Sequence, residues 1–233
     1  DTTVPVADLV TLADVTAQCS LDTLTAPTAT DNCSGSITGN TTTTFPITAQ
    51  GITVVTWTYE DANGNITTQN QNVVIEDTTV PVADLVTLAD VTAQCSLDTL
   101  TAPTATDNCS GSITGNTTTT FPITAQGITV VTWTYEDANG NITTQNQNVI
   151  IEDTTDPVFT TSPASVTVQC DSDTTTSALG TAEANDNCDT SITVAYADST
   201  AAGTGNNSII TRVWTATDDN SNSTTYTQTI TVV

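Results

Sequence analysis

Residues 53–75 read TVVTWTYEDANGNITTQNQNVVI, and this stretch decides the fold. In its first part Val55, Trp57 and Tyr59 alternate with threonines, which is the period of a strand with one buried face. The pair Asn63-Gly64 follows and is a strong signal for a tight hairpin connection. The alternation resumes before residue 75. The stretch therefore predicts two antiparallel strands joined at residues 61–65.

The chain contains this pattern three times. Residues 77–152 repeat residues 1–76 with a single change, Val74 to Ile150, and residues 153–233 form a more divergent copy. Segments rich in Thr and Val, interrupted by prolines, favour about seven short strands per copy. We expect an all-β protein of three tandem immunoglobulin-like antiparallel β-sandwich domains, 1–76, 77–152 and 153–233, stacked with almost no linker into an elongated rod.

Immunoglobulin-type ordering predicts which ends of the strands meet. It places the first strand near Pro5, the second at residues 15–19 and the last two at residues 53–59 and 67–75. The amino end of a domain, the loop after its second strand and its last hairpin turn then share one end. The last strand finishes at the opposite end, where the next domain begins with Asp77.

The charge balance excludes several classes of function. There are 26 acidic residues against one basic residue, Arg212, and no Lys or His, so the net charge is −25. Catalysis by a His-assisted nucleophile and Schiff-base chemistry are therefore excluded, and we expect no enzyme. Nucleic acid and anionic membranes repel such a chain, whereas cations are attracted to it. No apolar run is long enough to insert into a membrane, and the uniform acidity favours a monomer.

The cysteines divide evenly, two to each repeat. An even number inside small units indicates disulfides and an oxidising location. Free buried thiols are the alternative, and a zinc site is disfavoured because two cysteines without His cannot complete a tetrahedral set. We predict bonds within the repeats, between Cys19 and Cys33, Cys95 and Cys109, and Cys170 and Cys188.

Several motifs together resemble a known family. They are DTTVP at residues 1–5, VTAQC at 15–19, ATDNC at 29–33 and WTYEDANGN at 57–65. The chain resembles hyalin-repeat (HYR) domains, which are immunoglobulin-like modules of large secreted surface proteins, including bacterial gliding and adhesion proteins of Bacteroidota. The resemblance implies an extracellular adhesive or structural role without catalysis. Many animal members carry a further cysteine in the last strand, where Gln69 and Tyr226 fall here, so the animal cysteine pairing is not carried over.

Oxygen-bearing side chains persist at matching positions even in the divergent third copy. Their convergence at one end of each sandwich suits Ca²⁺, which takes 6–8 oxygen ligands from carboxylates, amides, backbone and water. With no basic residue nearby, a cation would also relieve the repulsion between carboxylates. The alternative is a polar turn that binds no ion, because Asn, Asp and Gly are ordinary turn residues. The candidate ligands are Asp1, Asp31, Asp61, Asn63 and Asn65; Asp77, Asp107, Asp137, Asn139 and Asn141; and Asp153, Asp186, Asp218, Asn220 and Asn222.

These observations predict a spacer. We expect a Ca²⁺-stiffened, disulfide-stapled spacer or filament shaft of a secreted cell-surface protein, whose partners are the neighbouring repeats of the same chain. Two alternatives stay open: repeats that themselves bind a glycan or a partner cell surface, and accessory modules of a secreted hydrolase. Glu60 and Asp61 are not a glycosidase pair, since Thr217 replaces Glu60 in the third copy. Trp57, Trp133 and Trp214 are expected in the core rather than as sugar-stacking platforms.

Overall fold

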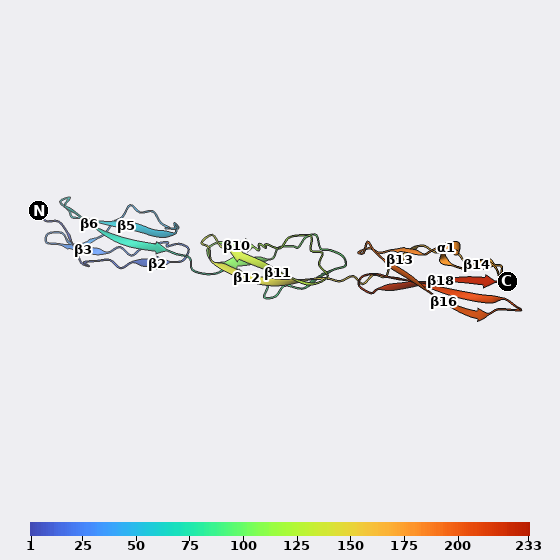
Figure 1. Ribbon diagram of the computed structural model, residues 1–233. Coiled ribbons are helices and arrows are strands. Elements are labelled where there is room, and N and C mark those ends of the chain that lie inside the picture. Colours follow the sequence, from blue (N-terminus) through green and yellow to red (C-terminus); the bar gives the residue numbers. More distant parts are fainter. The chain divides into compact units, whose positions relative to one another are not determined.

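The computed structural model describes residues 1–233 and is almost entirely β-structure (Figure 1). Every repeat contributes six strands, and the third adds one helical turn. The elements are β1 (Val6–Ala7), β2 (Val15–Ala17), β3 (Thr28–Asp31), β4 (Gly35–Thr38), β5 (Gly51–Glu60) and β6 (Ile66–Ile75); β7 (Val82–Ala83), β8 (Val91–Ala93), β9 (Thr104–Asp107), β10 (Gly111–Thr114), β11 (Gly127–Glu136) and β12 (Ile142–Ile151); and β13 (Val158–Thr161), β14 (Val166–Val168), α1 (Thr176–Leu179), β15 (Glu183–Asn185), β16 (Thr193–Ala202), β17 (Ser208–Thr217) and β18 (Ser223–Val232).

Two sheets form the β-sandwich of each repeat. Their strand orders are β1-β3-β4 and β2-β6-β5 in the first repeat, and the second repeat has the same arrangement. In the third repeat one sheet is reduced to β13-β15 and the other extends to β14-β18-β17-β16. Each repeat forms six strands rather than the expected seven or so, and isolated bridges such as Leu21 to Ile47 lie outside them. The predicted all-β sandwich fold is therefore confirmed.

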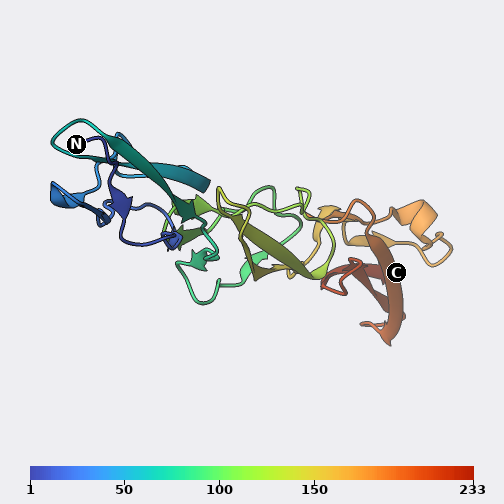
Figure 2. The same ribbon diagram turned by 90° about the vertical axis from the view of Figure 1, so that its left-hand side faces the viewer.

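The predicted hairpin is β5 with β6, visible as a long strand pair in Figure 2. Trp57 lies opposite Gln69, and Gly51 lies opposite Ile75. Because side chains alternate between the faces of a strand, Val55, Trp57 and Tyr59 all point into the core, where Trp57 is 3% exposed. Its counterparts Trp133 and Trp214 are buried to the same extent. The tryptophans are core residues, as predicted, and are not exposed enough to stack on sugars.

Strand β2 runs in the opposite direction from the one expected. It pairs in parallel with β6, the last strand of the same repeat, with Val15 beside Val73 and Ala17 beside Ile75. The same parallel pair recurs as β8 with β12 and as β14 with β18. The chain therefore leaves β2 at the end of the repeat where β6 finishes, rather than returning to the start. This direction decides where Cys19 lies.

The chain separates into two compact units. One comprises Asp1–Thr87, Ala102–Thr117 and Thr132–Gln145, and the other comprises Leu88–Thr101, Thr118–Val131 and Asn146–Val233. Each unit therefore contains one complete connection between successive repeats. The domain boundaries at residues 76/77 and 152/153 stay a prediction. The four-residue α1 is the chain's one helix, and no helix is long and apolar enough to cross a membrane.

Candidate functional site at the repeat junctions

Three acidic side chains meet at one end of the first repeat, which we call the head. Asp1 precedes β1, Asp31 ends β3 and Asp61 follows β5, and their carboxylate oxygens lie within 4.8 Å of one another. Asp31 and Asp61 are buried, whereas Asp1 is exposed. The opposite end, where β2 and β6 finish, is called the tail. The topology thus gathers carboxylates from three distant parts of the sequence.

The hairpin turn fixes the carboxylate of Asp61. Its Oδ1 accepts hydrogen bonds from the backbone amides of Asn63 and Asn65 at 2.8 Å each, and its Oδ2 accepts one from Asn65 Nδ2 at 2.7 Å. The bond from the Asn65 side chain, with the backbone bonds, lowers the pKa of Asp61 from its ordinary value of 3.8. Asn65 therefore acts as a donor that orients Asp61, and the Asn63 side chain is exposed.

The corresponding side chains of the other repeats behave alike. Asn141 donates to Asp137 Oδ2 at 2.8 Å, and Asn222 donates to Asp218 Oδ2 at 2.8 Å. Both also donate to the carbonyl oxygen of the first residue of their repeat, Asp77 or Asp153. The side chains of Asn139 and Asn220 are exposed. The second asparagine of each turn therefore holds the acidic residue in place through its side-chain nitrogen.

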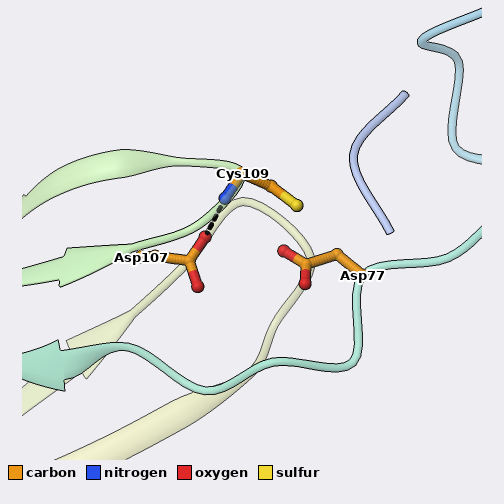
Figure 3. A group of neighbouring side chains, drawn as sticks. All are labelled: Asp77, Asp107 and Cys109. Atoms are coloured by element: carbon orange, nitrogen blue, oxygen red, sulfur yellow. Dashed lines mark hydrogen bonds between the residues drawn. The ribbon is translucent and has the colours of Figure 1, made fainter. Parts of the chain in front are cut away.

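The second head contains two buried carboxylates that face each other (Figure 3). Asp107 Oδ1 accepts bonds from the amides of Cys109 and Ser110 at 2.9 and 2.8 Å, and Asp77 Oδ1 accepts one from the amide of Thr79 at 3.1 Å. Asp77 is 5% exposed and Asp107 is 4% exposed, yet the Oδ2 atom of each has no hydrogen-bond partner. In each carboxylate, therefore, one oxygen accepts hydrogen bonds and the other has none.

The third head repeats this arrangement with more charge. The Oδ2 atoms of Asp153 and Asp186 are again buried without a partner. Asp189 and Asp218 join them, so that four carboxylates lie within 4.8 Å of one another. Asp189 was not predicted from the sequence, because Ser34 and Ser110 stand at its position in the other copies. The copy that has diverged most has gained a carboxylate.

The carboxylates of these clusters repel one another. Two carboxylates closer than 4.8 Å repel by about 3.5 kcal/mol at an effective dielectric constant of 20, and an unpartnered buried acceptor adds roughly 1–3 kcal/mol. Arg212, the only basic residue, is bound to Asp198 instead. A hard divalent cation would pair with the unpartnered oxygens, so the residues present fit Ca²⁺. Asp137 lies outside the group of Asp77, Asp107 and the Cys109 sulfur.

A second residue was missed by the sequence reasoning. With its Nδ2 turned toward the carboxylates, Asn32 donates to Asp1 Oδ2 at 3.2 Å and to Asp31 Oδ2 at 3.1 Å. Its counterpart Asn108 instead approaches two sulfurs, with Nδ2 3.3 Å from Cys19 Sγ and 3.1 Å from Cys109 Sγ. The signal that could have found it is the triplet Asp-Asn-Cys, which all three copies keep.

The disulfides connect successive repeats, so the predicted pairing is wrong. Bonds join Cys19 to Cys109 and Cys95 to Cys188, not Cys19 to Cys33, Cys95 to Cys109 or Cys170 to Cys188. The reason is the direction of β2, which carries Cys19 to the tail while Cys33 stays at the head beside Asp31. The ten residues of β5 between these ends span roughly 33 Å, far beyond the reach of a disulfide. Cys33 and Cys170 are free and exposed.

Side-chain amides complete each junction. The Gln18 side chain accepts bonds from the Thr78 amide and the Thr79 hydroxyl, at 3.0 and 3.1 Å, and donates to the Thr78 hydroxyl at 3.1 Å. Gln50 accepts a bond from the Asp77 amide at 3.2 Å. Gln94 and Gln126 make the equivalent bonds to the third repeat. Each tail therefore binds the first three residues of the next head.

Comparison with solved structures finds extracellular cadherin chains among the matches. Mouse Cadherin-23 EC22-24 matches over 99% of both chains with 13% identity and a TM-score of 0.38. The Protocadherin GammaB4 extracellular domain matches 98% of this chain and 49% of its own, with 14% identity and a TM-score of 0.36. These scores are too low to support an argument about function.

Two curated relatives are more similar in sequence. Hyalin of Lytechinus variegatus is 36% identical over 91% of this chain, and Hyalin of Strongylocentrotus purpuratus is 36% identical over 72% of it. The matched regions cover only 40% and 15% of the lengths of these relatives. Both are sea-urchin proteins, so the expected bacterial source has no support from them.

The family comparison covers all three repeats. Residues 6–75, 79–151 and 158–232 each match the family described as "HYR-like domain with 4 cysteines". Each matched range contains two cysteines rather than four, and four of the six bond across the junctions. The chain belongs to the HYR-like domain family.

Proposed function

We propose that this chain is a non-catalytic shaft segment of a large extracellular adhesive protein, in which Ca²⁺ and a disulfide fasten each repeat to the next. The observation that carries the proposal is the pair of carboxylates at each junction whose Oδ2 atoms are buried and have no partner. Similarity to proteins named Hyalin and the two disulfides support an extracellular, oxidising location.

The role of each group at a junction follows from its position. Asp77 and Asp107, or Asp153, Asp186, Asp189 and Asp218, would supply the oxygens that bind the cation. The tail of the preceding repeat holds the first residue of the head through Gln50 or Gln126. A cation bound there would therefore stiffen the connection and not only the loop.

The first experiment compares junction variants in calcium and in EGTA. Replacing Asp77 and Asp107 by Asn removes the repulsion, so the variant should melt higher than the natural chain in EGTA. In calcium the order should reverse, because ligand at 100 times its Kd stabilises the natural site by about 2.7 kcal/mol. Asp22→Asn with Asp98→Asn is the matched control, since both residues are exposed and lie outside the clusters.

One outcome would contradict the proposal that the clusters bind calcium. If the natural chain melts at one temperature in calcium and in EGTA, and calorimetry records no heat of binding, the clusters hold no calcium. Small-angle scattering of the same samples tests the shaft role: a stiffened connection gives a larger maximum dimension in calcium than in EGTA. An unchanged dimension with clear calcium binding would leave a cation site without a spacer function.

A further inference from the structure

The third repeat covers a sheet edge that the first two repeats leave open. In the third repeat β16 pairs antiparallel with β17 along all ten residues of both strands. The corresponding strand of the first repeat, β5, is the outer strand of its sheet, with β6 on one side. On its other side a single bridge joins Thr58 to Asn40. In the second repeat β11 is an outer strand in the same way.

The open edge of β5 carries backbone groups without a strand to pair with. The amide of Thr58 donates to the carbonyl of Asn40 at 2.7 Å, and the amide of Asn40 donates to the carbonyl of Thr58 at 2.9 Å. Alternate residues of a strand direct their backbone groups to the same side. The backbone groups of Ile52, Val54 and Thr56 therefore face this edge and could bond to a further strand.

The side chains along the open edge are apolar and uncharged. Ile52 is 69% exposed and Val54 is 52% exposed. At the same positions of the third repeat, where β16 covers the edge, Ile209 and Thr211 are partly buried. Proteins usually protect such an edge with Lys, proline or a bulge. Residues 51–59 contain neither a charge nor a proline, and their register with β6 is unbroken.

Neighbouring repeats of the chain do not cover this edge. The second repeat has one repeat before it and one after it in the sequence. Ile128 and Val130 of its β11 are nevertheless 67% and 52% exposed. The occupant of the edge is therefore something other than the adjoining repeats.

Exposed carboxylates stand at both ends of the open edges. In the first repeat Glu60 ends β5, and Glu76 follows Ile75, which lies opposite Gly51 at the other end of the strand. The counterparts are Glu136 and Glu152 in the second repeat, and Thr217 and Val233 in the third. The two carboxylates thus accompany the open edges and are missing where β16 covers the edge.

A cleft of about 480 Å³ adjoins Glu60. It is lined by Thr56, Thr58 and Glu60 of β5 and by Thr38 and residues 40–42, so it lies where the chain leaves the edge of the strand. The cleft has room for a long side chain, and its carboxylate favours one that ends in a positive charge.

We propose that the open edges of β5 and β11 bind an extended segment of a partner protein, which adds to each sheet as an antiparallel strand in the way that β16 does in the third repeat. The segment has β-branched or small residues beside Ile52 and Val54 and a basic residue toward each end, near Glu60 and Glu76. The net charge of −25 opposes a second copy of the chain as the occupant. This binding goes beyond the proposed shaft function and needs no cation.

The probe is a blocked peptide of alternating Thr and Val with Arg at each end, titrated into the full chain. Each chain should bind two peptides, one at β5 and one at β11. Exchange of the amides of Ile52, Val54 and Thr56 with solvent should slow roughly tenfold or more. The amides of Thr53 and Val55, which face β6, should not change. Absence of binding, or binding that leaves the edge amides exchanging as before, overturns the proposal.

Modified peptides test the mode of binding and the charge of the partner. Methylation of the peptide amides that face β5 should abolish binding, whereas methylation of the alternate amides should preserve it. A peptide with Glu in place of each Arg should bind roughly tenfold more weakly or worse. Equal binding of the two methylated peptides overturns strand addition, and equal binding of the Arg and Glu peptides overturns a basic partner.

Variants of Val54 assign the site to the edge. Val54→Pro removes an amide that faces the edge and no bond to β6, so the number of bound peptides should fall from two to one. Val54→Thr keeps the amide and the branched shape and is the matched control. Val54→Lys, which puts a repelling charge on the edge, gives the same readout if the proline variant does not fold. A folded Val54→Pro variant that still binds two peptides overturns the proposal, as does a natural chain that dimerises without peptide and protects the same amides.

Discussion

Gln94 shows how much of a junction depends on one side chain. Its Nε2 donates to the Thr154 hydroxyl at 2.8 Å, while its Oε1 accepts from the Thr154 amide and the Thr155 hydroxyl at 3.0 and 3.1 Å. A glutamine can serve both roles because its amide carries a donor and an acceptor. This pairing orders the start of the third repeat beside the carboxylate of Asp153.

Replacing Gln94 by Ala should loosen that segment. The lost hydrogen bonds, which are exposed, are worth about 1–2 kcal/mol in total, so the Thr154 amide should exchange with solvent roughly tenfold faster. Gln169→Ala is the control, since the corresponding side chain in the third repeat is exposed. Equal effects of the two variants on amide exchange would show that Gln94 matters to its own repeat and not to the junction.

Arg212 replaces an apolar core position in the third repeat. It corresponds to Val55 and Val131 and is 2% exposed. Its Nε and Nη2 donate to the two carboxylate oxygens of Asp198 at 2.8 Å each, and its guanidinium lies 4.8 Å from the centre of the Tyr196 ring. The hydrogen bonds from Arg212 lower the pKa of Asp198 from its ordinary value of 3.8.

This pair makes the third repeat sensitive to acid. Because the folded state lowers the pKa of Asp198, the stabilisation is complete above about pH 4 and is lost as the pH falls through the folded value. Asp198→Asn should abolish that loss and destabilise the repeat at pH 7 by about 2 kcal/mol, allowing for the partial exposure of Asp198. Amide exchange of peptides from the third repeat, compared with the first repeat as control, measures both effects. An acid response that persists in the variant would assign it to other carboxylates.

At the scale of elements, the turn between β17 and β18 carries a strained residue. Ser221 has a φ of 74°, in the left-handed region, where Gly64 and Gly140 stand in the other repeats. Nothing lies within 4 Å of the position that a Cβ would take at Gly64, so only the backbone conformation matters there. A non-glycine residue in this region costs about 1 kcal/mol.

Substitutions at this position of the turn should change the stability of the third and the first repeat in opposite directions. Ser221→Gly should stabilise the third repeat by about 0.5–1 kcal/mol, since the relief of strain is partly offset by the freedom of glycine in the unfolded chain. Gly64→Ala should destabilise the first repeat by about 1 kcal/mol. Denaturant midpoints followed by amide exchange report each repeat separately. A loss of stability in Ser221→Gly would mean that the serine side chain contributes more than its backbone strain removes.

The hairpin and the core were predictable because they depend on local periodicity. The spacing of Val55, Trp57 and Tyr59 predicts a buried face, and the pair Asn63-Gly64 predicts the turn. The partner of residues 15–17 was not predictable in this way. A three-residue strand has the same pattern in a parallel and in an antiparallel pair, so its direction is set by tertiary packing alone. The error in the cysteine pairing followed from that one ambiguity.

At the scale of the whole molecule, the two disulfides make the stability of each repeat depend on its neighbour. The Cys19–Cys109 bond closes a loop of 90 residues that contains most of the first repeat and part of the second. On the chain-entropy model such a loop contributes about 4.5 kcal/mol, compared with about 3 kcal/mol for the 15-residue loop of a bond within one repeat. Stability is therefore shared between neighbours, and the second repeat, if it were excised, would lose a disulfide at each of its ends.

Removing one bond distinguishes the two possible pairings. The double variant Cys19→Ser with Cys109→Ser should lower the free energy of unfolding of the first unit by about 4.5 kcal/mol, measured by urea denaturation. Cys33→Ser is the matched control and should change it by less than about 0.5 kcal/mol, because Cys33 is exposed and unbonded. If Cys19 were bonded to Cys33 within the repeat, Cys33→Ser would itself be strongly destabilising and would expose a reactive thiol at Cys19. Thiol labelling of the Cys33→Ser variant therefore decides the matter: labelling at Cys170 alone supports the junction bonds, and labelling at Cys19 refutes them.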